Sequence, residues 1–112
     1  MSKQAAAFAL EVLNAAVKAH QLHWATRSYP KHMALGSFYE ELPALIDSVI
    51  EAYQGKYGLI PAPKDDPVSF ISDLSAYLAT NRDFCEDSEI QNEIDAIATL
   101  CDSTLYKLKF LD

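Results

Sequence analysis

Apolar residues in this chain recur at alternating three- and four-residue steps, which is the spacing of one face of an α-helix. Near the start the pattern comprises Leu10, Leu13, Val17, His20 and Trp24. Segments with this period are separated by glycine and proline, and none shows the strict alternation of a β-strand. The pattern therefore predicts an all-α fold with four helices.

We expect helices over residues 2–27, 31–54, 67–82 and 88 to near the C-terminus. Their apolar stripes, after that of the first helix, are Leu35, Phe38, Leu42, Leu45, Ile46, Val49 and Tyr53; Val68, Ile71, Leu74 and Leu78; and Ile90, Ile94, Ile97, Cys101, Leu105 and Leu108. A long connector rich in proline separates the second helix from the third. The simplest architecture is an antiparallel four-helix bundle that forms one domain over residues 1–112.

Several residues mark the expected helix ends. Asp66 before Pro67 is a typical N-cap and first-turn pair. Ser88 and Gln91 have the spacing of a capping box, and Gly55 is suited to end the second helix. A kink is expected inside the second helix at Pro43, because proline removes a backbone donor and crowds the preceding turn.

The charge balance excludes a general nucleic-acid binder. The 112 residues carry nine Lys and Arg against sixteen Asp and Glu, for a formal charge of −7. Between Asp83 and Asp102 there are seven acids and no base. Since nucleic-acid binding depends on clustered basic residues, this segment would repel phosphate.

The cysteines and the hydropathy favour a cytoplasmic protein. Cys85 and Cys101 are too few for a disulfide framework and form no C-x-x-C pair, so we expect reduced thiols. The start of the chain lacks the features of a signal peptide. No apolar run approaches the ~20 residues that span a bilayer, and we therefore expect no membrane association.

The residues most capable of chemistry lie in the first two helices. All three histidines fall within thirteen residues, at His20, His23 and His32. With His32 at zero on a helical wheel, three acids of the second helix share one flank at about 60–100°. These acids are Glu40, Asp47 and Glu51. Imidazole and carboxylate together form a ligand set for ferrous iron, zinc or manganese, and helical bundles build such sites from facing helices.

Residues 18–55 resemble the first two helices of the Dps-type miniferritins, members of the ferritin-like superfamily. The likeness comprises the pair His23 and Trp24, a histidine opening the second helix at His32, and acids fifteen and nineteen residues later at Asp47 and Glu51. The resemblance implies a homo-oligomer joined through its first two helices. It also implies an iron-oxidising site at a two-fold interface, with His23, His32, Asp47 and Glu51 as ligands and His20 beside them or replacing one of them.

A second hypothesis belongs to a different class. The chain would be a non-enzymatic helical interaction or small-ligand-binding protein that keeps the helical frame without the metal. Gly36 stands where the miniferritins commonly have an acid, and the second half of the chain is short. In this interpretation His20 is a core residue, His23 caps the first helix, and Asp47 and Glu51 lie on a solvated face.

Overall fold

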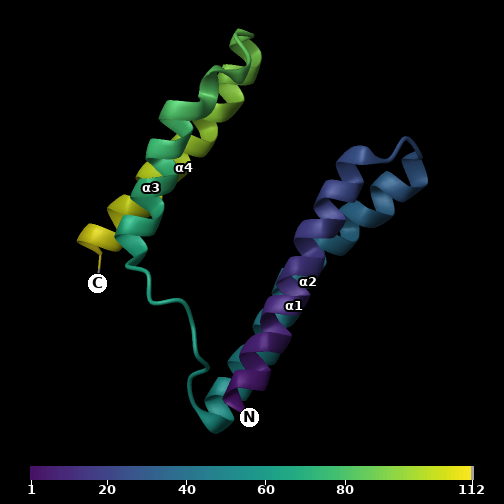
Figure 1. Cartoon of the computed structure of the whole chain (residues 1–112), viewed down its shortest axis with the longest axis vertical. Coiled ribbons are helices and arrows are strands. Elements are labelled where there is room, and N and C mark those ends of the chain that lie inside the picture. The colour runs from purple at the N-terminus through teal and green to yellow at the C-terminus, as the bar shows by residue number, and fades with distance from the viewer. Residues whose placement is uncertain (112) are drawn as a thin grey trace. The chain divides into compact units, whose positions relative to one another are not determined.

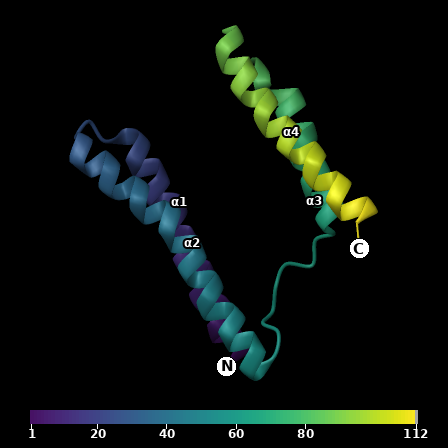
Figure 2. The same cartoon turned by 180° about the vertical axis from the view of Figure 1, so that it is seen from behind.

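The computed structural model describes residues 1–111, and within them it is helical, with no β-strand. The elements are α1 (Ser2–Ala25), α2 (Tyr29–Tyr57), α3 (Pro67–Asn81), the short 3-10 helix η1 (Arg82–Phe84) and α4 (Ser88–Phe110). The predicted all-α class is confirmed. In both views α1 runs beside α2, and α3 runs beside α4 (Figures 1 and 2).

The chain divides into two compact units, Met1–Ala62 and Pro63–Asp112, each built around one helical hairpin. Within the first unit α1 packs against α2, and within the second unit α3 packs against α4. The expectation that residues 1–112 form one domain, and that this domain is a four-helix bundle, stays a prediction.

Three of the four buried residues of the α1/α2 hairpin are small. Ala16 and Ala19 are the buried residues of α1, and Gly36 and Ile46 are the buried residues of α2. Small residues such as alanine and glycine allow two helix backbones to approach closely. The stripe expected to face inward from α1 is instead displaced to the side of this contact, and all of its members except His20 are exposed.

The ends of α2 differ from the sequence expectation. Ser28 is the N-cap, and its Oγ accepts a hydrogen bond from the Lys31 backbone N–H at 3.4 Å. The helix continues through Pro43 and past Gly55 to Tyr57. Gly55 was the wrong residue for the cap, because Gly58 occupies that position with φ of 101°, a conformation that favours glycine.

The start of α3 follows the prediction. The side chain of Asp66 accepts a hydrogen bond from the Ser69 backbone N–H at 3.0 Å, and Pro67 follows in the first turn. This arrangement satisfies a donor that the helix itself leaves unpaired.

The predicted capping box at Ser88 is wrong. Asp87 is the N-cap of α4, and the Gln91 side chain turns away to donate to the carbonyls of Arg82 and Cys85, each at 2.7 Å. The Arg82 guanidinium in turn donates to Gln91 and, at 2.6 Å, to Asp95. Side chains of α4 thus satisfy the backbone of η1, so tertiary contacts outweigh the local cap.

Both cysteines are free thiols, with Cys101 buried and Cys85 partly exposed. Over residues 1–111, no helix combines the length and apolar character needed to cross a membrane.

Enlarging the small-residue contact should destabilise the first hairpin. We expect Ala19→Leu to lower the free energy of unfolding by about 1–3 kcal/mol, because the added methyl groups must displace α2. Ala15→Leu, at an exposed position of the same helix, is the control and should change stability by less than about 0.5 kcal/mol. Urea unfolding followed by circular dichroism measures both, and equal effects would contradict the close approach.

Candidate functional site

The turn between α1 and α2 brings two of the predicted ligands together. Only residues 26–28 lie between the helices. The Thr26 backbone N–H closes the last turn of α1 on the carbonyl of Leu22, and Ser28 begins α2 as its N-cap. A connection this short makes the helices antiparallel neighbours, so His23 near the end of α1 lies opposite His32 near the start of α2.

His23 and His32 form a reciprocal pair, here called the histidine clasp. Nδ1 of His23 lies 2.7 Å from the carbonyl oxygen of His32, and Nδ1 of His32 lies 3.0 Å from the carbonyl oxygen of His23. Their rings stack with centroids 3.6 Å apart and an interplanar angle of 22°. Each side chain is partly buried.

The hydrogen bonds of the clasp place a proton on Nδ1 of both rings. A carbonyl oxygen can only accept, so Nδ1 must carry the proton and donate in each case. In the neutral imidazole this leaves Nε2 with a free lone pair. Among the described residues, neither Nε2 has a hydrogen-bond partner. Metal-binding histidines typically donate their other ring nitrogen to a carbonyl or carboxylate in this way.

The clasp also has a structural role. The His23 carbonyl is one of the last four of α1, which have no partner within the helix. His32 donates to it and so caps α1 from the neighbouring helix. In the non-metal hypothesis His23 was expected to cap its own helix. The structure shows instead that His32 caps α1, while His23 donates to the carbonyl of His32.

Gly36 makes the space that the clasp requires. A Cβ atom at this position would lie 3.3 Å from Cε1 and 3.4 Å from Nδ1 of His23. Gly36 is one turn after His32 and is buried against α1. From the sequence it appeared only as a missing acid, although a glycine inside a helical pattern can mark a place where a neighbouring group approaches the backbone closely.

His20 is held one turn before the clasp by aromatic contacts. Its ring stacks on Tyr39 with centroids 3.7 Å apart and an interplanar angle of 10°, and it lies 4.7 Å from the ring of Trp24. The centroid of His23 is 6.2 Å away. Sequence reasoning did not assign Tyr39 to the site, although it is seven residues after His32 and hence on the same face of α2.

The acidic members of the predicted ligand set do not join the histidines in one chain. Asp47 and Glu51 are exposed on α2, as is Glu40. At 1.5 Å per residue, Asp47 lies about 22 Å and Glu51 about 28 Å beyond His32 along the helix. Within residues 1–111, no three His, Cys, Asp or Glu side chains are arranged to hold a metal ion. One chain therefore presents two halves of the expected ligand set at separate places.

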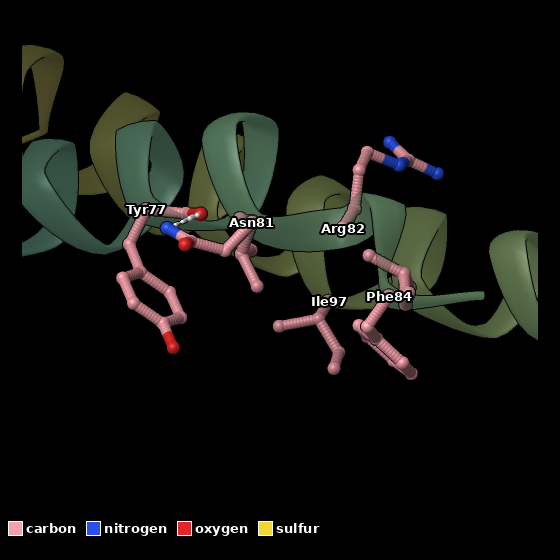
Figure 3. Close-up of a pocket in the computed structure, with 7 residues that line it drawn as sticks. Tyr77, Asn81, Arg82, Phe84 and Ile97 are labelled. Atoms are coloured by element: carbon pink, nitrogen blue, oxygen red, sulfur yellow. Dashed lines mark hydrogen bonds between the residues drawn. The ribbon is translucent and has the colours of Figure 1, made fainter.

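The unit Pro63–Asp112 contains a second candidate site, an apolar hollow of about 270 Å³ beside η1. Figure 3 shows Tyr77, Phe84 and Ile97 projecting from the same side of the hairpin, while the Arg82 side chain points away from them. Phe84 is 76% exposed. The Asn81 amide donates to the Tyr77 carbonyl at 3.0 Å. This hollow offers an apolar surface and no convergent set of catalytic groups.

Comparison with known families identifies the chain as a member of one family. The model of a family of unknown function, DUF5856, matches residues 23–108, about three quarters of the sequence, and the chain belongs to this family. No curated protein and no solved structure matches the chain significantly. The resemblance to miniferritins therefore depends on the residue pattern alone.

Two glycine substitutions separate the role of Gly36 from helix propensity. Replacing an interior helical glycine with alanine stabilises by roughly 0.5–1 kcal/mol. We expect about this gain for Gly55→Ala, where an added Cβ meets nothing within 4 Å. Gly36→Ala should gain less, because His23 must move by a few tenths of an ångström. Urea unfolding measures both, and ¹⁵N spectra of the imidazoles should show altered His23 and His32 signals only for Gly36→Ala. Equal gains with unchanged imidazole signals would contradict the close approach.

Proposed function

We propose that this protein binds a divalent transition-metal ion, foremost iron, between two copies of itself. Imidazoles of one copy and carboxylates of the other would form the site. The observation that supports it is the histidine clasp, in which backbone carbonyls hold Nδ1 of both His23 and His32 and leave both Nε2 atoms free. Such an arrangement orients a ligand before the ion arrives.

The donor set fits a metal only if a second copy contributes. His23 and His32, with His20 nearby, offer nitrogen ligands but no carboxylate, and three ligands are not assembled within residues 1–111 of one chain. Asp47 and Glu51 are exposed and free to face another molecule. The proposal therefore includes a homo-oligomer formed through α1 and α2. It also includes the ferritin-like antiparallel four-helix bundle as the arrangement of residues 1–112.

In this site each residue type has a distinct task. Neutral imidazoles bind a divalent ion without adding charge, whereas Asp47 and Glu51 stabilise a more highly charged ion. Iron held there would supply one-electron chemistry, and the proposed reaction is the loss of one electron from each Fe(II) to dioxygen or peroxide. Zinc or manganese would suit the same donors, in which case no oxidation of the ion is required.

A second candidate function is favoured by the apolar hollow beside η1. Tyr77, Phe84 and Ile97 present exposed apolar surface on one side of the α3/α4 hairpin. A non-enzymatic interaction protein would use such a surface to receive an apolar side chain of a partner or a small ligand. In this case the histidine clasp is a cap for α1 and nothing more.

Metal binding distinguishes the two functions. With Co²⁺, Zn²⁺ or anaerobic Fe²⁺ at about 100 times its Kd, we expect about 2.7 kcal/mol of stabilisation and a rise in Tm of roughly 10 °C, because the ion binds only the folded state. The double change His32→Ala with Asp47→Ala should remove this rise. Each variant is compared with its own metal-free Tm, since loss of the clasp also lowers basal stability.

Glu11→Ala, which removes an exposed acid of α1, is the control and should keep the full metal response. A wild-type Tm that does not change at millimolar metal would contradict the metal-binding function and favour the interaction protein.

A further inference from the structure

The face of α1 that does not pack on α2 carries a row of exposed apolar residues, here called the α1 seam. It consists of Leu10, Leu13, Val17 and Trp24, which are 60%, 42%, 58% and 70% exposed, together with the partly buried His20. Their steps of three and four residues place them at the a and d positions of successive heptads. This is the pattern by which one helix packs along another in a coiled coil.

The α1/α2 hairpin has a second apolar surface on its other side. Phe8 is nine residues before Val17, so at about 100° per residue the two side chains point in opposite directions from α1. Phe8 lines a hollow with Val49 and Tyr53 of α2, and this surface therefore spans both helices. The narrow seam lies on the opposite side of α1 and is exposed along its length, apart from the partly buried His20.

Charge favours a second copy of this chain as that partner. In a coiled-coil arrangement the flanking positions on the free side of the seam are Asn14 and Gln21, which are exposed and uncharged, whereas Ala16 and His23 on its other side face α2. Two identical seams can therefore meet without repulsion between like charges.

The distribution of charge between the two units points the same way. Residues 1–62 are electrically neutral, with bases Lys3, Lys18, Arg27, Lys31 and Lys56 and acids Glu11, Glu40, Glu41, Asp47 and Glu51. The entire net charge of −7 belongs to residues 63–112. Copies that associate through the neutral unit avoid the repulsion that two acidic units would generate.

We propose that the α1 seam packs against the α1 seam of a second copy and forms a two-fold homodimer. The inference rests on the proposed function in that the metal site needs a second copy, and it adds which surface joins the copies. Burial of the seam is driven by its apolar side chains, so the dimer forms without metal. His20 would lie inside the interface, where a single polar residue among apolar ones specifies the register of two helices.

The test is the native mass in EDTA, measured by light scattering after size exclusion and by sedimentation over a range of concentrations. We expect a dimer for the wild-type chain. Leu13→Glu with Val17→Glu should raise the dimer Kd by at least about 100-fold, because two carboxylates per copy would lose hydration without a partner. Both positions are exposed in the single chain, so the helical content of the monomer should not change.

A matched control changes the net charge by the same two units at a position outside both apolar surfaces. Lys18→Glu replaces an exposed residue that lies about 100° around α1 from Val17 and about 80° from Phe8, and this variant should remain dimeric. If the seam glutamates lower the helical content, the neutral pair Leu13→Gln with Val17→Gln takes their place, with the same expected order of dimer stability.

Three results would contradict the proposed seam interface. They are a wild-type chain that is monomeric at all concentrations, a dimer that persists in the seam variant, and a dimer that is lost only in the control. The outcome is separable from that of the proposed function. A seam-dependent dimer that binds no metal would leave the interface standing and refute the metal site. If the chain binds metal but dimerises equally well with the seam substitutions, the metal site would stand and the seam interface would be refuted.

Discussion

The close approach of α1 and α2 is the constraint on which the rest of the first unit depends. Alanines on α1 and Gly36 on α2 allow the two backbones to come near each other, and the short turn at residues 26–28 keeps them antiparallel. Because small residues occupy the contact, the larger apolar side chains of α1 project to its sides. The same constraint thus produces a tight hairpin and leaves apolar surface available for further association.

The histidine clasp shows how one geometry can serve structure and chemistry together. The hydrogen bond from His32 satisfies a carbonyl at the end of α1, which stabilises the hairpin. The same bond places the proton of the imidazole on Nδ1 and leaves Nε2 as a potential ligand. A structural role for the clasp is therefore no argument against metal binding. The two interpretations differ only in whether carboxylates of another molecule reach the free nitrogens.

In the second unit, side chains of α4 form hydrogen bonds with the short helix η1. The η1 turn has backbone carbonyls that no regular helix satisfies. The side-chain amide of Gln91 in α4 donates hydrogen bonds to two of them. Arg82 binds Gln91 and the Asp95 carboxylate, and it is the one base among the many acids near this turn. Its side chain points away from Tyr77, Phe84 and Ile97 (Figure 3). The unit consequently combines an acidic surface with an exposed apolar one.

The sequence by itself determined the helices, since the apolar period, the proline and glycine positions and the Asp66–Pro67 start depend on local backbone and side-chain chemistry. It also placed the three histidines at the junction of the first two helices. Only the tertiary structure decided which face of α1 is covered, because alanines and leucines both fit a helical stripe and the distance between backbones selects the smaller ones. The role of Gly36 and the hydrogen bonds of Gln91 were likewise decided by partners distant from a local pattern. Sequence spacing reports neighbours within one helix, whereas contacts between helices arise from shape and unpaired backbone groups that appear only after the helices pack.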